Sequence, residues 1–287
     1  FNMFTARGNE FLPYILGDTD TPMPLFVKPD RKISVQDVKN AMRDHYEGTP
    51  LDISKDFGAG PYHTPYRLSP LSFKVGDKEY FNERPISTQQ SGFVFVAQMR
   101  STLPDAIGGV LWFGTDDANM TVFTPVYCCT DKVPVCYSRV DGADYITFSW
   151  NSSFWIFNWV SNMVYPRYDL MIGDVRATQN ELETTFNEAQ EGIESAAAKL
   201  LEKDPAKAKA FLTNYTNMTA QSAFDTWKRL GEFIIVKYND GVVRKMKDGK
   251  YERNAIGQPA GVVRPGYPKE FLEEYVKQTG DRYKMPD

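Results

Sequence analysis

NERPISTQQSGFVFVAQMRSTLPDAIGGVLWFGTDDANMTVFTPVYCC, residues 82–129, is the stretch that decides the fold. It contains the three most apolar strand candidates of the chain, at residues 92–98, 109–115 and 120–127. All three are rich in Val, Phe, Trp and Tyr, and Gly, Pro, Asp or Asn stand at their ends. Because this composition and punctuation are typical of β-strands, we predict a sheet here.

The first of these strand candidates carries apolar residues on both of its sides. Phe93 and Phe95 would face one way, and Val94 and Val96 would face the other way, since side chains alternate along a strand. We therefore expect the strand to be buried on both faces, as in a sheet that lies between two layers.

Helical patterns dominate the chain after residue 130. Apolar residues that recur every three or four positions predict helices at 34–46, 151–164 and 181–202, a further helix capped by Thr219, and a last helix that begins near Pro268. Two Gly-containing turns between strand-like residues predict hairpins at 75–80 and 232–245. The overall expectation is a mixed structure with a central sheet and packed helices.

Composition excludes several functional classes. Of the 287 residues, 42% are hydrophobic and 24% are charged, which is ordinary for a globular protein. A net charge of -4 without a Lys/Arg cluster argues against a nucleic-acid partner. The nearest approach to a membrane span, 153–165, is short and interrupted by Asn and Ser, so we expect no membrane association through a helix.

The three cysteines of the chain do not form a recognisable site. Cys128, Cys129 and Cys136 are too few for a disulfide framework, and no His/Cys set has zinc spacing, so we expect no metal. We interpret them as small packed residues near a strand end. A catalytic role for Cys128 or Cys129 finds no recognisable His partner in the sequence.

Two polar segments are candidates for binding or catalysis. The first, MRDHYEGTPLD, places Arg43 and His45 beside Asp44 and Glu47 at the end of the helix predicted at 34–46. These residues could bind the charge of a substrate, or they could form a buried ion-pair and capping network that anchors the next loop. Both interpretations remain open at the level of the sequence.

The second candidate segment is NERPISTQQ, directly before the strand predicted at 92–98. Arg84 would emerge at the edge of the sheet among Asn82, Thr88 and Gln89. A fixed guanidinium with neighbouring amides could orient a carboxylate or stabilise a developing negative charge. A structural salt bridge of Arg84 is the alternative. In contrast, we interpret the Asp-Asp-Ala-Asn segment at 116–119 as a turn between two strands.

Four long motifs in fixed order resemble the dipeptidase A family of cysteine peptidases, to which the secernins are related: MRDHYEGTPLD, NERPISTQQSGFVFVAQMR, LPDAIGGVLWFGTDDANMTVFTPVYC and SSFWIFNWVSN. The resemblance extends from about PLFVKPD to PGYPKEF and is similar to the C-terminal half of such a protein. The family belongs to the N-terminal-nucleophile hydrolases.

The resemblance implies an α+β fold, a four-layer αββα sandwich of which this chain supplies the C-terminal part. On this interpretation residues 1–287 are part of one domain. Residues 1–70 would form a covering arm, a short helix and a loop, residues 71–148 the core strands, and residues 149–287 mainly helices with a late hairpin.

The resemblance also implies a mechanism. In the superfamily the first residue of the mature chain, here a cysteine, is the nucleophile, and its own α-amino group is the base. Phe1 carries no nucleophilic atom, so we expect this chain alone to be inactive and to need the N-terminal portion of the same protein as its partner. No metal and no organic cofactor are implied.

Arg84 is the one residue that the resemblance assigns to catalysis. In choloylglycine-hydrolase and ceramidase-like relatives an Arg just before a core strand borders the nucleophile, and the NERPIS segment is similar. Arg84 would polarise the site or hold the carboxyl end of the substrate. Asn82, Thr88 and Gln89 are substrate-binding candidates by proximity, together with Arg43 and His45.

The expected function is that of a broad-specificity dipeptidase of bacterial type, with dipeptides as substrates. Hydrolysis of another N-acyl amide and a non-catalytic domain that binds peptides or partners are the alternatives. Assembly into a homo-oligomer stays open, and so does the compartment, either bacterial cytoplasm or an exported setting.

Overall fold

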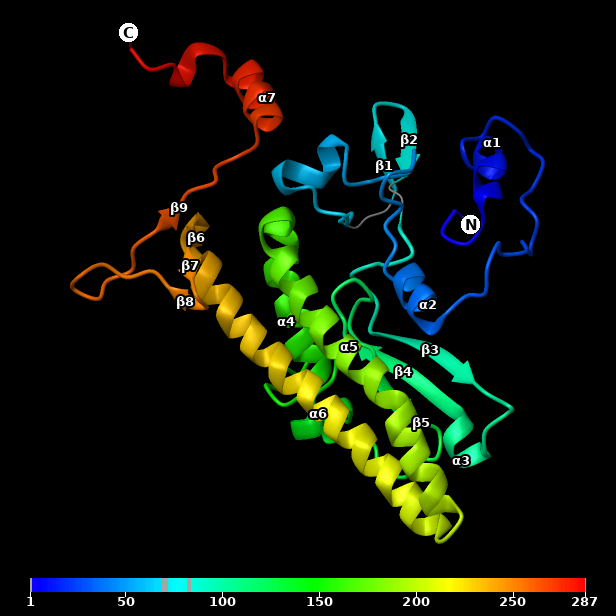
Figure 1. Ribbon diagram of the computed structural model, residues 1–287. Coiled ribbons are helices and arrows are strands. Elements are labelled where there is room, and N and C mark those ends of the chain that lie inside the picture. The colour runs from blue at the N-terminus through cyan, green and yellow to red at the C-terminus, as the bar shows by residue number, and fades with distance from the viewer. Residues whose placement is uncertain (1, 69–71, 82–83, 287) are drawn as a thin grey trace.

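A three-stranded antiparallel sheet forms the centre of the computed structural model, which describes residues 2–68, 72–81 and 84–286 (Figure 1). Its strands are β3 (Phe93–Met99), β4 (Gly109–Thr115) and β5 (Thr124–Tyr127), in the order β3-β4-β5. Val96 pairs with Trp112, and Trp112 pairs with Pro125. The predicted sheet is confirmed, but the third strand begins at Thr124 because residues 120–123 belong to a buried loop.

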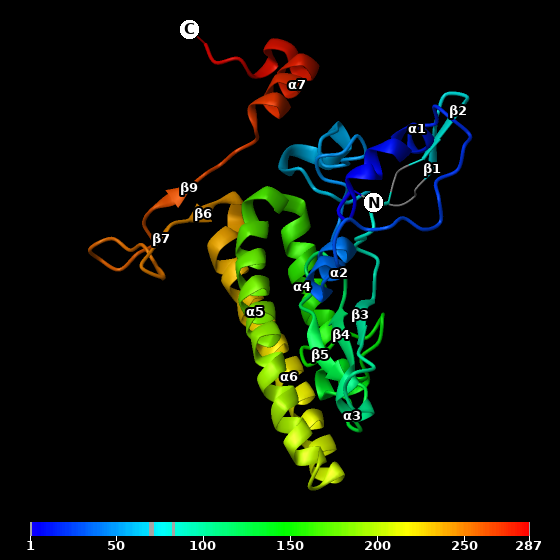
Figure 2. The same cartoon turned by 45° about the vertical axis from the view of Figure 1, so that its right-hand side comes forward.

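Three helices accompany the sheet: α4 (Ser153–Val164), α5 (Tyr168–Leu201) and α6 (Pro205–Tyr238). The helices α5 and α6 form an antiparallel pair that covers one face of the sheet (Figure 2). Phe157 of α4 stacks on Trp227 of α6 with ring centroids 4.7 Å apart, which joins α4 to this layer. Among the described residues, no helix combines the length and the apolar character that a membrane span needs.

The two faces of the sheet differ in burial. On the covered face Val94, Val96 and Trp112 are buried in the core between sheet and helices. On the other face Phe93 and Phe95 are 58% and 49% exposed. The expectation of burial on both faces is therefore wrong for this chain by itself, because its helices α5 and α6 supply a layer on one side only.

The described residues up to Phe81 form an arm, a short helix and a hairpin. The arm contains a 3-10 turn at Ala6–Phe11 and α1 (Leu12–Ile15). Helix α2 (Val35–Met42), within the helix predicted at 34–46, begins at a capping box in which the Ser34 hydroxyl accepts from Asp37 N and Asp37 accepts from Ser34 N. The predicted hairpin consists of β1 (Ser72–Val75) and β2 (Lys78–Phe81).

The C-terminal region departs from the sequence expectation at Thr219 and at residues 232–245. The helix expected near Thr219 is the 34-residue α6, in which Thr219 lies in the interior and its hydroxyl donates to Tyr215 O. The helix continues through Tyr238, so the hairpin predicted at 232–245 is wrong. Packing of Leu230 and Ile234 in the core overrides the β-propensity of this apolar segment.

Short strand pairs and a helix follow α6. β6 (Val243–Arg244) pairs with β9 (Val262–Val263), and β7 (Met246–Lys247) pairs with β8 (Lys250–Tyr251). The predicted last helix is α7 (Lys269–Thr279), which both views show away from the sheet.

Candidate functional site

The polar segment 84–90 contacts the loop after α2 through Ser87 and the C-terminal end of α4 through Gln89. Pro85 and Ser87 are buried and anchor it, and Ser87 N donates to Asp44 O at 3.1 Å. Arg84 is exposed, and among the described residues it forms no ion pair or hydrogen bond. The candidate Asn82 lies outside the described residues. The guanidinium of Arg84 is thus available to an external group.

Gln89 lines a cavity of about 330 Å³, here called the Gln89 pocket. Its amide donates to Asn162 Oδ1 of α4 at 3.1 Å. Tyr66 and Tyr165 also line the pocket, with ring centroids 5.7 Å apart. Thr88 does not reach it, since its hydroxyl bonds the side chain of Gln90. The pocket offers neutral amide and aromatic groups.

Two hydrogen-bonded chains lead from the Gln89 pocket to a buried pair of acids. In one chain Asn162 donates to Asn158 Oδ1 at 3.2 Å, and Asn158 donates to Asp116 Oδ1 at 2.9 Å. In the other chain the Tyr165 hydroxyl donates to Asp117 Oδ2 at 3.0 Å. The wall of the pocket is therefore connected to Asp116 and Asp117 by hydrogen bonds between side chains.

Asp116 and Asp117 are 2% and 0% exposed. Asp116 adopts φ 68°, a left-handed conformation, and its backbone N–H donates to Gly92 O at 2.9 Å. Burial raises the pKa of Asp116 to about 8, and the neighbouring Asp117 charge acts in the same direction. Burial also raises the pKa of Asp117. Both carboxyls therefore hold a proton more tightly than an exposed aspartate does.

The sequence interpretation of residues 116–119 as a turn was incomplete. The segment does turn the chain after β4, but every residue of 116–123 is buried. One feature of the sequence indicates this burial. The turn lies directly between two apolar runs, LWFGT and TVFTPVY, with no further polar residues to separate them. Asn158, Asn162 and Tyr165 carried no signal that distinguishes them from ordinary helix residues.

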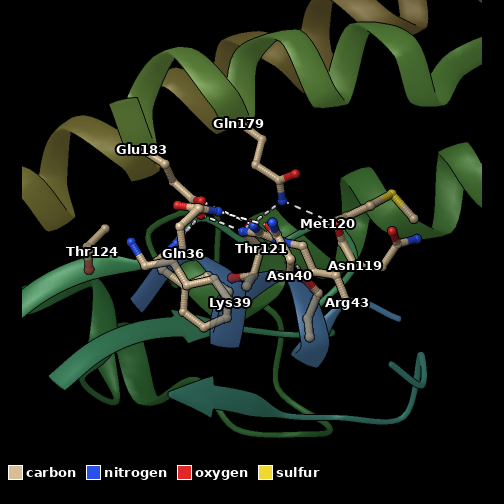
Figure 3. Close-up of polar contacts among 12 residues, drawn as sticks. Gln36, Lys39, Asn40, Arg43, Asn119, Met120, Thr121, Thr124, Gln179 and Glu183 are labelled. Carbon is tan, nitrogen blue, oxygen red and sulfur yellow. Dashed lines mark hydrogen bonds and ion pairs between the residues drawn. The ribbon is translucent and has the colours of Figure 1, made fainter. Parts of the chain in front are cut away.

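Arg43 and Glu183 hold the buried loop 116–123 in place (Figure 3). The two side chains are 9% and 4% exposed and are joined by two bonds of 2.5 and 3.1 Å. Arg43 also donates to the carbonyls of Ala118 and Thr121, each at 3.2 Å. Glu183 accepts in addition from Phe123 N at 2.8 Å. The guanidinium of Arg43 and the carboxylate of Glu183 are thus engaged with each other and with the loop backbone. This arrangement corresponds to the buried ion-pair interpretation of Arg43.

Lys39 lies beside this ion pair and is fully buried (Figure 3). Its ammonium stands 3.6 Å from the ring centroid of Trp112 and donates to Asn187 Oδ1 at 3.1 Å. Burial lowers the pKa of Lys39 to about 8, against the attraction of Glu183. The cationic side chains of Lys39 and Arg43 thus fix one face of α2 to the sheet and to α5.

His45 is 1% exposed and contacts Glu47 twice. Its Nδ1 lies 3.0 Å from Glu47 Oε1, and its backbone N–H donates to Glu47 Oε2 at 2.9 Å. Its Nε2 is buried without a partner among the described residues. His45 itself cannot contact a substrate in this arrangement, but Glu47, half exposed, can.

The cysteines remain poor candidates for a nucleophile. Burial raises the pKa of Cys136 to about 12 and raises that of Cys129, while Cys128 is exposed. Nδ1 of His45 contacts Glu47, and Nδ1 of His63 contacts Asp169, so neither ring nitrogen is paired with a thiol. Within the described part of the chain, no three His, Cys, Asp or Glu side chains are grouped as a metal site.

The sequence profile of peptidase family C69 matches residues 2–181, which include α2, the sheet and the segment 84–90. The chain belongs to peptidase family C69. In this C69 chain the matched region ends within α5, two residues before Glu183.

The chain is similar to several proteins that are named as dipeptidases. The chain is 27% identical to the probable dipeptidase B of Lactococcus lactis over 223 residues, 75% of this chain and 40% of the relative. It is 32% identical to the probable dipeptidase of Salmonella dublin over 119 residues, 42% of this chain and 23% of the relative. With dipeptidase A of Lactobacillus helveticus it shares 26% identity over 137 residues, 48% of this chain and 24% of that protein. The match of this C69 chain thus covers less than half the length of these relatives.

Proposed function

We propose that this chain is part of a dipeptidase that hydrolyses the peptide bond of dipeptides with broad specificity. The observation that carries the proposal is the C69 profile over residues 2–181, supported by relatives named dipeptidase. Because the match covers 40% of the Lactococcus relative, the activity is proposed for the complete protein and not for the chain alone.

The nucleophile in this proposal is an N-terminal cysteine supplied by the portion of the protein that lies outside this chain. The three cysteines within the chain are unsuitable, since two have raised pKa values and none has a free α-amino group. The chain by itself is then expected to be inactive. The peptide bond would be broken by thiol attack on its carbonyl carbon, with an acyl-enzyme that water hydrolyses.

Arg84 is the residue we propose to border that nucleophile. Its exposed guanidinium, without a partner among the described residues, supports a role in holding the substrate carboxyl end or in stabilising negative charge. Gln89 is proposed as a substrate-binding amide because it lines a pocket. We retain Thr88 and Asn82 as weaker candidates. Arg43 and His45 would act through the loops that they hold.

The bare face of the sheet supports the proposed four-layer sandwich. Phe93, Phe95 and Met99 are 58%, 49% and 61% exposed, and they lie along one face of an edge strand. We propose that a second sheet from the N-terminal portion covers them. An apolar face of this kind otherwise invites aggregation.

The proposal is tested by the hydrolysis of Leu-Ala and of N-acetylleucine by the complete protein. A dipeptidase cleaves Leu-Ala and leaves N-acetylleucine intact. Cleavage of N-acetylleucine alone would replace the proposal by an N-acyl amide hydrolase. Cleavage of neither, with peptide binding retained, would favour the non-catalytic alternative.

A further inference from the structure

The N-terminal arm and the loop after α2 enclose a cavity of about 380 Å³, here called the arm pocket. Its apolar wall comes from both sides and includes Met3, Leu12, Ile15, Leu51 and Ile86. Ile86 belongs to the segment 84–90 of the candidate site, so the pocket adjoins that site. A cavity of this volume is in the range of small-ligand pockets.

Hydrogen bonds within the arm hold its wall of the pocket in a defined conformation. Asp30 accepts from the Thr5 hydroxyl at 3.1 Å and from Ala6 N at 2.7 Å, and its own N–H donates to Phe4 O at 3.0 Å. Thr5 is 3% exposed. These bonds close the arm on itself and fix the direction of the side chains that line the pocket.

The charged groups that line the arm pocket are acidic. Glu47 and Asp44 line it, and no Lys, Arg or His is among its described lining residues. Burial opposes the ionisation of Glu47, but the bonds from His45 outweigh it and lower the pKa of Glu47 to about 2. Glu47 therefore carries its charge at neutral pH, in a fixed position in the lining of the cavity and with a half-exposed side chain.

The backbone at Tyr46 brings Glu47 into this position. Tyr46 adopts φ 64°, a conformation that is uncommon for a residue with a side chain. Asp44 Oδ1 accepts from Tyr46 N at 3.1 Å, and the Thr49 hydroxyl donates to Tyr46 O at 2.7 Å. The chain thus reverses between His45 and Glu47, which allows Glu47 to fold back on His45 while it lines the pocket.

We propose that the arm pocket binds the free α-amino end of a small peptide, with the ammonium at Glu47 and an apolar first side chain against the arm. An ammonium is the group that a fixed carboxylate without a Lys or Arg partner selects, and the apolar wall selects the side chain beside it. The inference rests on the proposed function, since it assigns a site to the amino end of the substrate, whereas Arg84 is proposed to hold the carboxyl end.

The test is a calorimetric titration of the chain with leucinamide, which carries the ammonium and the apolar side chain but no carboxylate. We expect leucinamide to bind at least about tenfold more tightly than N-acetylleucinamide, which lacks the charge, and than glycinamide, which lacks the side chain. Glu47→Gln should remove the preference over N-acetylleucinamide. Glu10→Gln is the matched control, because Glu10 lies on the same arm, pairs with Arg7 and does not line the pocket.

A second variant protects the test against a folding defect, since Glu47 also holds His45. Leu12→Trp fills the apolar wall without touching Glu47 and should weaken leucinamide binding with an unchanged melting temperature. Absent binding of leucinamide, or binding that both variants leave unchanged, would overturn the inference.

The outcome is separable from that of the proposed function. If the complete protein fails to cleave Leu-Ala while the chain binds leucinamide through Glu47, the dipeptidase proposal falls and the arm pocket stands. If Leu-Ala is cleaved with the same KM by wild type and Glu47→Gln, the arm pocket falls and the dipeptidase stands.

Discussion

Arg43 and Glu183 lie 140 positions apart in the chain and form an almost fully buried ion pair with two hydrogen bonds. The pair joins the C-terminal end of α2 to α5. The pair does more than join two helices. Its remaining hydrogen bonds go to the backbone at Ala118, Thr121 and Phe123, so it satisfies the polar groups of a loop that has no access to water.

Arg43→Met should therefore destabilise the chain strongly. The variant leaves the Glu183 carboxylate buried and unpaired, which costs on the order of 3–5 kcal/mol in the free energy of unfolding. Arg31→Met is the matched control, because Arg31 pairs with Asp37 at the surface. Urea denaturation measures both. Equal stabilities of the two variants would show that the buried pair does not hold the loop.

Asp116→Asn should change the pH dependence of stability. The folded-state pKa of Asp116, about 8, lies above its unfolded value of 3.8, so the folded chain binds the extra proton between these values. In wild type this group makes the free energy of unfolding fall as pH rises from about 4 to about 8. The Asn variant should lack that part of the slope. Parallel pH profiles in thermal melts of the two proteins would contradict a raised pKa of Asp116.

Two glycines in the long helices should respond oppositely to Ala. A Cβ at Gly231 of α6 would stand 2.2 Å from Trp159 Cζ3, and overpacking of this kind costs about 1–3 kcal/mol. At Gly192 of α5 a Cβ meets nothing within 4 Å, so Ala should stabilise by about 0.5–1 kcal/mol. A gain of stability in Gly231→Ala would mean that α4 and α6 pack less closely than described.

Phe95→Ser should distinguish the chain alone from the complete protein. Phe95 is 49% exposed here, so we expect little change in the stability of the chain and a gain in solubility. If a second sheet covers this face, the same variant should cost about 1.5–3 kcal/mol in the complete protein. Ile146→Ser is the control, because Ile146 is 94% exposed in a turn outside the sheet. The same small effect of Phe95→Ser in both proteins would argue against the sandwich.

The sequence predicted the elements whose signals are local. The start of the helix predicted at 34–46 and the strand ends at Gly109 and Thr115 follow from neighbouring residues, and the structure has them where they were expected. The exposed face of Phe93 and Phe95 could not be predicted, since alternation shows which residues share a face but not which face has a covering layer.

The candidate site was predicted only in part, for a similar reason. Polar residues such as Arg84 and Gln89 were identified because they precede an apolar strand. The pairing of Arg43 with Glu183 and the contact of Asp117 with Tyr165 join distant parts of the chain, and no pattern within either segment encodes them. The helix through residues 232–238 was misread because Ile and Val favour strands until tertiary packing decides.

The central claim, that the segment 84–90 borders the active site of a dipeptidase, is tested most directly by kcat/KM for Leu-Ala in the complete protein with Arg84→Ala. We predict a loss of at least about tenfold, about 1.4 kcal/mol of transition-state stabilisation, with unchanged melting temperature. Arg229→Ala, an exposed site on α6, should keep the wild-type value. Wild-type kcat/KM in Arg84→Ala would contradict the claim.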